Sequence, residues 1–268
     1  MLRERLIVIL ILLPIGVALA ALGGWFFTIF VAVILGVAAW EYARLFIGGG
    51  YQPSRTLLIA GVALLAVARY LWGESGSIPL LVGLTLLAMG YHTIAYARGQ
   101  QTSAFDFAIT AAGILYVGWL GNYLVSLRSL SGGLYWALLV IGSIAIGDGF
   151  AYLVGHLLGR HKMAPNLSPG KTWEGYIGGI LGAIAGGALL GWVFGLMVPE
   201  ISPRLGLLFG LILGVIAPLG DFGESMLKRQ FGVKDSGRLL PGHGGILDRL
   251  DSWFWAAPIG FYLILWLV

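Results

Sequence analysis

Long apolar runs separated by short polar breaks extend along the whole chain. Runs of about 17–25 apolar residues are long enough to cross a bilayer as helices. The polar breaks divide the sequence into nine such runs, at 6–22, 25–40, 57–72, 78–96, 105–127, 134–157, 176–198, 205–220 and 252–268. The pattern therefore predicts an all-α, polytopic integral membrane protein with about nine transmembrane helices, of which the first two are short.

The composition supports this fold class. Of 268 residues, 59% are hydrophobic and 10% are charged, whereas soluble domains average about 45–50% apolar and about 25% charged residues. The 43 glycines suit close approach of membrane helices, and the ten Trp and eleven Tyr suit anchoring at the membrane interface. The absence of Cys excludes disulfides and thiolate metal sites. The first apolar run resembles a signal peptide, but another run follows at Trp25, so we interpret it as a retained helix.

The distribution of positive charge predicts an orientation. If the N-terminus is cytoplasmic, thirteen Lys and Arg residues lie on the cytoplasmic side and only Arg69, Arg128 and Arg204 lie opposite. Such an excess is typical of cytoplasmic loops. We therefore expect a multi-pass protein of the cell inner (plasma) membrane, with the C-terminus outside.

The polar residues are unevenly divided between the two parts of the chain. Two long polar segments, 158–175 and 221–251, fall on the cytoplasmic side, and both belong to the second half. We therefore expect residues 1–104 to form a scaffold of N-terminal helices and residues 105–268 to form the catalytic region.

The twelve acidic residues fall into two groups. Glu4, Glu41, Glu74 and Glu200 are expected at helix ends or in short loops, and Asp106 at a helix start, where a carboxylate favours the helix dipole. The other seven gather on or near the cytoplasmic side of the last four helices: Asp148, Glu174, Asp221, Glu224, Asp235, Asp248 and Asp251. They predict a cytoplasm-facing polar cavity in the C-terminal half.

Segment 225–251, SMLKRQFGVKDSGRLLPGHGGILDRLD, holds eight charged residues around a glycine-rich turn. Cations beside clustered carboxylates on such a backbone favour a metal-assisted phosphate site over a solvated connector between helices. Gly244 and Gly245 allow backbone N–H groups to point at an anion. We interpret His243 as a phosphate donor or a turn-stabilising residue rather than as a metal ligand.

Several of these carboxylates have the spacing of metal ligands. Asp248 and Asp251 are three residues apart on one helix face and repel each other unless a cation lies between them. Asp221, Ser225 and Lys228 share another helix face, with Glu224 adjacent to Asp221. Without Cys, hard oxygen ligands indicate magnesium or manganese rather than zinc.

Asp148 lies inside an apolar run, where a carboxylate is costly and requires a polar cavity or a partner. Tyr152, Gly155 and Gly159 follow it on one face at helical spacing. We interpret this face as a cavity wall; the alternative is a buried Asp that bonds to a neighbouring helix and specifies the fold.

Segment 160–175, RHKMAPNLSPGKTWEG, contains a Gly-Lys-Thr triplet. A phosphate-binding P-loop is excluded, because Pro165 stands where that motif has Gly and no strand precedes it. The sequence instead predicts a turn that leads into a helix, where Ser168, Lys171 and Thr172 can bind phosphate oxygens. The basic residues of this segment could alternatively contact anionic lipid headgroups.

These motifs together resemble the phosphatidate cytidylyltransferases (CDP-diacylglycerol synthases). The resemblance rests on Ser225-x-Leu227-Lys228-Arg229, Lys234-Asp235-Ser236-Gly237, Leu240-Pro241-Gly242-His243-Gly244-Gly245-Ile246-x-Asp248-Arg249-Leu250-Asp251, Asp148-x-x-Ala151-Tyr152-x-x-Gly155-x-x-x-Gly159 and Ser168-Pro169-x-Lys171-Thr172-x-Glu174-Gly175. The chain departs from the family at Gly170, where members often carry a second Lys, and so has one cation fewer in this loop.

The resemblance implies an activity and its partners. Members convert CTP and phosphatidate to CDP-diacylglycerol and pyrophosphate with Mg²⁺, and K⁺ is associated as a second metal with the aspartates that match Asp221 and Asp248. Members are nine-helix homodimers in membrane lipid, and no nucleic acid is expected as a partner; Mn²⁺ is the alternative to Mg²⁺.

On this basis each site residue is assigned a role. The catalytic residues are Asp221, Asp248, Asp251, Lys228 and Arg249, and the metal ligands are Asp221, Asp248 and Asp251. The substrate-binding residues are Ser168, Lys171, Thr172, Ser225, Arg229, Lys234, Asp235, His243, Gly244 and Gly245. The cavity residues are Asp148, Tyr152, Glu174 and Glu224.

Three alternatives stay open from the residues themselves. A CTP-dependent kinase of a lipid alcohol would release CDP instead of pyrophosphate. A transporter or channel would use Asp148 and Asp221 as a pathway, although no internal repeat is visible. A lipid-binding scaffold would leave the seven clustered acids unexplained.

Overall fold

A computed structural model describes residues 13–237, 239 and 244–268. In this part of the chain, seven helical stretches are long and apolar enough to cross a membrane, and Leu13–Leu22 form a shorter apolar helix. Two of the seven, Ser103–Ser129 and Pro203–Gln230, each combine consecutive helical segments. The predicted class, an α-helical polytopic membrane protein, is confirmed. The chain divides into two compact units, a first unit of Met1–Ser129 with Leu227–Leu250 and a second of Leu130–Met226 with Asp251–Val268. This division reflects packing and does not test the predicted functional boundary after residue 104.

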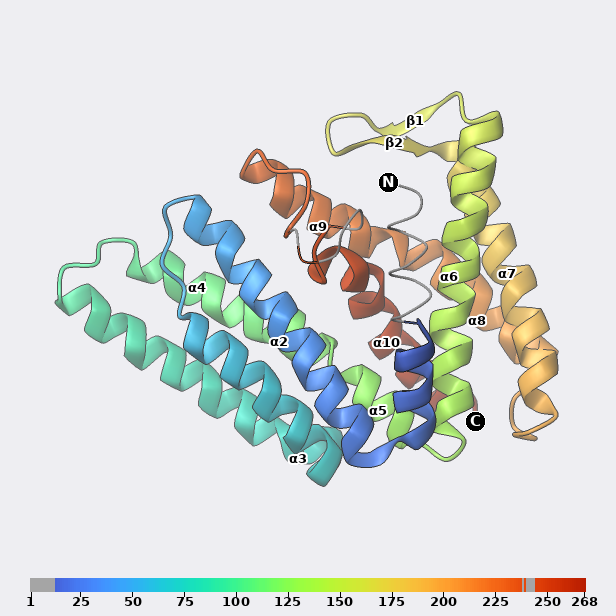
Figure 1. Ribbon diagram of the computed structural model, residues 1–268, viewed down its shortest axis with the longest axis horizontal. Helices are drawn as coiled ribbons and strands as arrows, with labels where there is room; N and C mark the ends of the chain where they lie inside the picture. Colours follow the sequence, from blue (N-terminus) through green and yellow to red (C-terminus); the bar gives the residue numbers. More distant parts are fainter. Residues whose placement is uncertain (1–12, 238, 240–243) are drawn as a thin grey trace. The chain divides into compact units, whose positions relative to one another are not determined.

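The helices of the first unit follow one another with short connections (Figure 1). They are α2 (Gly24–Gly48), α3 (Arg55–Ala97), α4 (Ser103–Gly113), a π-helical segment (Ile114–Leu120) and α5 (Tyr123–Ser129). Helix α2 has 25 residues, so the expectation of a short second helix is wrong. The sequence placed its end at residue 40 because Glu41 is charged, but Glu41 is buried inside the helix.

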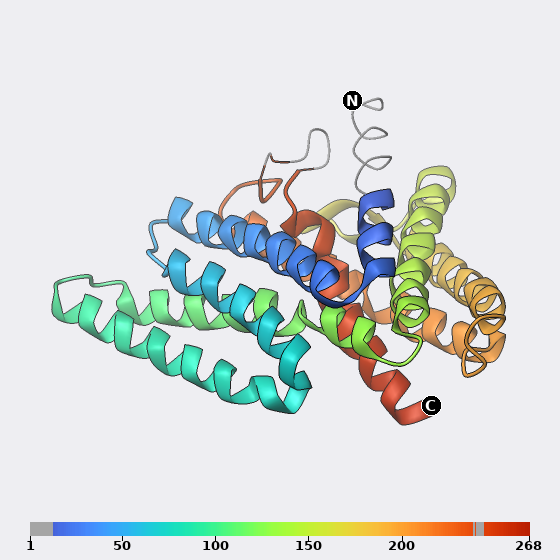
Figure 2. The ribbon, with the colours of Figure 1, turned by 60° about the horizontal axis from the view of Figure 1, so that its bottom comes forward.

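Helix α3 corresponds to two of the predicted spans, 57–72 and 78–96. Its 43 residues are interrupted at Gly73, whose backbone is non-helical with φ 69°. A positive φ of this kind is readily adopted by glycine. Figures 1 and 2 show that the two halves of α3 run back alongside each other from this region. Gly73 therefore allows one continuous apolar stretch to reverse direction.

Arg69 lies inside α3, within the predicted span 57–72, and is buried, with 2% of its surface exposed. Its guanidinium carbon lies 4.1 Å from the centroid of the Trp119 ring and 4.4 Å from that of Tyr123. Cation–π attraction of this kind offsets part of the cost of burying the charge. The π-helical segment thus brings an aromatic ring against a buried cation.

The second unit contains a helical core and one β-hairpin. It includes α6 (Gly133–Leu158), β1 (Lys162–Ala164), β2 (Ser168–Thr172), α7 (Trp173–Gly195), α8 (Pro203–Ile216) and most of α9 (Pro218–Gln230) and α10 (Leu247–Leu267). The antiparallel strands pair Lys162 with Thr172 and Ala164 with Ser168. The segment predicted as a turn before a helix is therefore a strand, because β1 supplies the backbone partner that the local pattern did not reveal.

Glycines line both packing faces of α7. Toward α6, Gly178, Gly182 and Gly186 lie against the side chains of residues 154, 150 and 146. Toward α8, a Cβ at Gly206 would overlap the carbonyl oxygen of Gly187, and one at Gly210 would overlap that of Ala183. Small residues let membrane helices approach until their backbones touch. The glycine content noted in the sequence is therefore used for close helix packing in this unit.

Candidate active site

The carboxylate of Asp248 contacts three residues of the glycine-rich segment within the first unit. Asp248 lies in the first turn of α10 and is buried. Its Oδ1 pairs with Lys228 Nζ at 2.5 Å. Its Oδ2 accepts hydrogen bonds from Ser236 N (2.9 Å), Ser236 Oγ (2.9 Å) and Gly245 N (2.8 Å). The structure thus brings together Lys228, Gly245 and Asp248, which were predicted to belong to one site, and adds Ser236, which had been given no role.

The Lys228–Asp248 ion pair is shielded from solvent. The side chains are only 9% and 4% exposed, respectively. Charges in such a place need a partner, because removing one member leaves the other buried without compensation. Lys228 occupies the last turn of α9, where a cation also interacts favourably with the helix dipole. The pair therefore fixes the last turn of α9 against the first turn of α10 inside this unit.

The glycines before α10 allow the backbone to approach the carboxylate. Gly244 has φ 81°, and a Cβ there would lie 2.6 Å from Asp248 Oδ2. The sequence predicted that the N–H groups of Gly244 and Gly245 point at an anion. In the structure the N–H of Gly245 donates to the protein's own Asp248 carboxylate.

Glu41 is a member of this cluster that the sequence analysis did not identify. It was expected at a helix end or in a short loop, but it lies within α2 and is fully buried. Its Oε2 accepts hydrogen bonds from Leu247 N at 2.8 Å and from Ser236 Oγ at 3.3 Å. A carboxylate within an apolar run was the available signal, since such a group requires a polar partner.

In the second unit, Lys171 of β2 pairs with Asp221 of α9. The Nζ–Oδ2 distance is 2.6 Å, and both side chains are about one-third exposed, at 27% and 35%. Ser225 Oγ donates to Asp221 Oδ1 at 3.2 Å, and Lys171 Nζ lies 4.4 Å from the centroid of the Phe222 ring. This contact joins the two polar segments that the sequence analysis placed on the same side of the membrane.

Thr172 and Glu174 attach the hairpin to α7. Thr172 is the N-cap of α7, and its hydroxyl accepts from Gly175 N at 3.2 Å. The Glu174 carboxylate accepts from the backbone N–H groups of Arg160 and His161 and lies 2.5 Å from His161 Nδ1. Thr172 was predicted to bind substrate, and Glu174 was predicted to line a cavity. In the structure, both side chains accept hydrogen bonds from backbone N–H groups of the protein itself. Ser168 is half-buried at the start of β2.

The other predicted site residues differ in exposure. Glu224 and Asp251 are buried. The exposed residues are Asp148, Tyr152, Arg229, Lys234, Asp235 and Arg249. Tyr152 stacks on His156, with ring centroids 6.0 Å apart, and Arg229 donates to the carbonyl oxygen of Val233 at 2.8 Å. His243 lies outside the described residues.

The donor set is compatible with magnesium that binds together with a nucleotide. Within the described ranges, no three His, Cys, Asp or Glu side chains are close enough to form a metal site by themselves. Mg²⁺ commonly takes only one or two protein carboxylates and completes its shell with substrate phosphates and water. Asp221 and Asp248 are hard oxygen donors, and each already neutralises a lysine cation. Each carboxylate, taken within its own unit, is a hard oxygen donor of the kind that such an ion binds.

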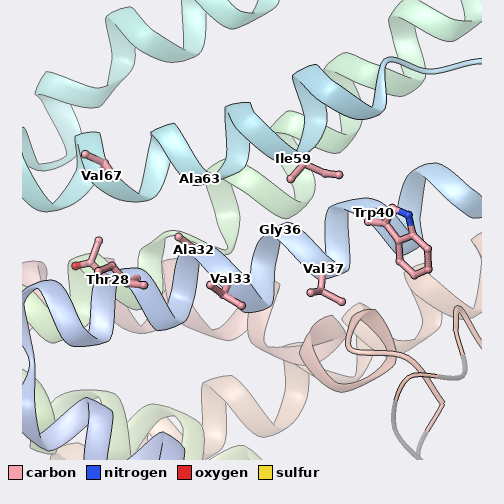
Figure 3. A pocket seen from close by; sticks show the side chains of 10 residues that line it. Thr28, Ala32, Val33, Gly36, Val37, Trp40, Ile59, Ala63 and Val67 are labelled. Atoms are coloured by element: carbon pink, nitrogen blue, oxygen red, sulfur yellow. The ribbon is translucent and has the colours of Figure 1, made fainter.

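A hollow of about 440 Å³ between α2 and α3 lies elsewhere in the first unit (Figure 3). Apolar side chains such as Val33, Trp40 and Ile59 line it. The Thr28 hydroxyl donates to the carbonyl oxygen of Gly24 in its own helix. The hollow thus presents no charged group, and its chemistry does not suit a nucleotide.

Helices long and apolar enough to cross a membrane, together with ion pairs on glycine-rich polar segments, are the features of an integral membrane protein with a polar site. The chain matches the model of the "Cytidylyltransferase family" over residues 3–267 and belongs to this family. It is 41% identical over 275 residues to a phosphatidate cytidylyltransferase of Pseudomonas aeruginosa, covering 99% of this chain and 97% of that protein. It is 36% identical over 177 residues to one of Staphylococcus saprophyticus, covering 65% and 66% of the two chains.

Proposed function

We propose that this protein transfers the cytidylyl group of CTP to phosphatidate, giving CDP-diacylglycerol and pyrophosphate. The similarity to the Pseudomonas aeruginosa enzyme along almost the full length of both chains carries this proposal. The structure supports it by placing Lys228, Ser236 and Gly245 around the Asp248 carboxylate. These residues belong to the long motif through which the sequence resembles this enzyme family.

The reaction exchanges one phosphorus–oxygen bond for another. A phosphate oxygen of phosphatidate attacks the α-phosphorus of CTP, and the bond from that phosphorus to the oxygen bridging to the β-phosphate breaks. Pyrophosphate leaves with the bonding electrons. Both reactants are anionic, so much of the barrier is charge repulsion. The attacking phosphate is already ionised, and no strong general base is required.

The cationic residues of the chain reduce this repulsion. Lys171 and Lys228 are positioned by Asp221 and Asp248, and we propose that Arg229, Lys234 and Arg249 supply further positive charge to the phosphates. Preorganised cations of this kind stabilise charge in the transition state without reorganising during the reaction.

We propose that Asp221, Asp248 and Asp251 hold Mg²⁺, with K⁺ as a second metal and Mn²⁺ as an alternative to Mg²⁺. A bound magnesium ion would neutralise phosphate oxygens and the leaving pyrophosphate. Lys171 and Lys228, which pair with Asp221 and Asp248, would supply positive charge to the substrate phosphates.

We further propose that the chain crosses the bacterial inner membrane nine times. This count takes α3 as two crossings and the N-terminal apolar run as one. The N-terminus and the two polar segments would face the cytoplasm, where CTP is available, and the C-terminus would lie outside. A homodimer and a polar cavity open to lipid complete the proposed arrangement.

The test is transfer of label from cytidine-labelled CTP into the lipid fraction. Purified protein is incubated with phosphatidate in mixed micelles containing magnesium and potassium. We expect transfer that requires phosphatidate, releases equimolar pyrophosphate, and is lost with EDTA and restored by excess magnesium. No transfer from a monodisperse preparation would refute the activity. Release of CDP with a lipid alcohol would indicate the kinase instead.

A further inference from the structure

We propose that Glu41 of α2 is a positioning residue for the transfer reaction, acting on Asp248 through Ser236 and the start of α10. The inference rests on the proposed function, because it assigns Glu41 a role in that reaction. Glu41 belongs to the N-terminal helices, which were expected to be scaffold. The proposal therefore gives a residue of these helices the role of holding the catalytic segment in position.

The Glu41 carboxyl group is enclosed by the glycine-rich segment. The residue is fully buried, and Oε2 accepts hydrogen bonds from Leu247 N and Ser236 Oγ. A Cβ at Gly237 would overlap Oε1, and one at Gly245 would overlap Oε2. Two glycines of the motif thus lie where any side chain would displace Glu41, which accounts for the absence of side chains there.

Ser236 connects the Glu41 and Asp248 carboxylates. Its hydroxyl lies 3.3 Å from Glu41 Oε2 and 2.9 Å from Asp248 Oδ2, and it has one proton to donate. The Ser236 backbone N–H donates to Asp248 as well. A shift of Glu41 therefore changes how the Ser236 hydroxyl is shared, and with it the hydrogen bonding of Asp248.

Leu247 provides a second connection. Its N–H, the first of α10, donates to Glu41, and the next residue is Asp248. Glu41 therefore holds the helix start that carries Asp248, as well as the serine that bonds to it. Removing a carboxylate that orients a site residue from behind, without touching the substrate, commonly changes activity by about 10–100-fold.

A carboxylate suits this position better than an amide. Both hydrogen-bond partners of Oε2 are donors, and Oε1 has no hydrogen-bond partner among the described residues. A glutamine would remove the negative charge, and an NH₂ group at the position of Oε2 would face these two donors. Burying a carboxylate in a membrane helix is costly, and a purely apolar contact would have filled the space without that cost.

The first experiment compares Glu41→Gln with the unaltered enzyme. We measure kcat, the KM for CTP and for phosphatidate, and the thermal midpoint in detergent. We expect kcat to fall about 10–100-fold, with KM values within about threefold. Asp106→Asn is the matched control, since Asp106 is also a fully buried carboxylate of the first unit, and it bonds to Gln52, Gln100 and Thr102. It should lower the thermal midpoint at least as much and leave kcat per folded molecule unchanged.

A double-mutant comparison distinguishes positioning from a general packing role. If Glu41 acts through Ser236, Glu41→Gln should reduce kcat less in a Ser236→Ala background than in the unaltered enzyme. Equal fold-losses in both backgrounds would overturn the route through Ser236, and an unchanged kcat in Glu41→Gln would overturn the whole proposal. An inactive but monodisperse unaltered enzyme would instead refute the proposed function.

Gly237→Ala decides the matter if Glu41→Gln does not fold. The added methyl group would displace the Glu41 carboxylate while keeping its charge. Gly237 does not have a positive φ, so alanine adds no backbone strain there. We expect the same fall in kcat; normal kcat in this variant would show that the position of Glu41 does not matter.

Discussion

At the scale of single residues, the hydrogen bonds of Asp248 determine what a substitution does. One oxygen faces the Lys228 ammonium and the other faces three N–H and O–H donors. An asparagine in this place must turn its NH₂ group toward donors on one side or the other. It would also leave Lys228 buried without a counter-charge, which is strongly unfavourable.

We therefore predict that Asp248→Asn lowers kcat by on the order of 10²-fold or more at saturating magnesium. The labelled-CTP assay measures this directly. Glu200→Gln, which removes an exposed carboxylate in the loop before α8, is the control and should retain normal turnover. Near-normal turnover of Asp248→Asn would contradict the assignment of Asp248 as metal ligand.

At the scale of secondary-structure elements, the N-cap of α7 gives a prediction about stability. The Thr172 hydroxyl accepts the N–H of Gly175 and is buried. Loss of such a cap costs about 1 kcal/mol, which corresponds to about 2–4 °C in thermal midpoint for a chain of this size. We expect this decrease in Thr172→Ala but not in Thr172→Ser, which keeps the hydroxyl.

The same pair of variants tests the predicted phosphate contact of Thr172. A higher KM for CTP in the alanine variant, absent in the serine variant, would support a second role for this hydroxyl. An unchanged KM in both would restrict Thr172 to capping.

The contact between α7 and α8 gives a second prediction at this scale. A Cβ at Gly206 would overlap the carbonyl oxygen of Gly187, so Gly206→Ala must push the two backbones apart. We expect a loss of about 1–3 kcal/mol, measured as a lower thermal midpoint in detergent. Gly90→Ala in α3 is the control, because no atom lies within 4 Å of the added methyl group. Equal midpoints in the two variants would show that the close packing does not limit stability.

At the scale of the whole molecule, the orientation in the membrane can be tested with cysteines. The chain contains no Cys, so single-cysteine variants need no background changes. Lys162 and Glu200 are exposed residues that precede and follow α7, respectively. If α7 crosses the membrane once, a membrane-impermeant maleimide should label Lys162→Cys in inverted vesicles and Glu200→Cys in intact cells. Labelling of both from one side would contradict the proposed topology.

The family and the helical membrane fold could be predicted from the sequence, because both depend on features that are local in the chain. Apolar runs of bilayer length specify membrane helices wherever they pack, and the residues of the long motif are contiguous. The motif also indicated that Lys228 and Asp248 act together, since only 20 positions separate them. The reversal within α3 was predicted as two helices, but its cause at Gly73 was not apparent.

Only the tertiary structure placed Glu41 beside Ser236 and Leu247, which follow it by 195 and 206 positions. Helix packing brings such residues together, and the periodicity within either segment does not indicate which residues will meet. The burial of Arg69 under two aromatic rings and the pairing of β1 with β2 depend on spatial neighbours in the same way. The sequence by itself determined the chemical groups, the helices and the family, since these follow from local patterns. The tertiary structure decided which groups support one another, because the energy of a buried charge depends on the atoms around it.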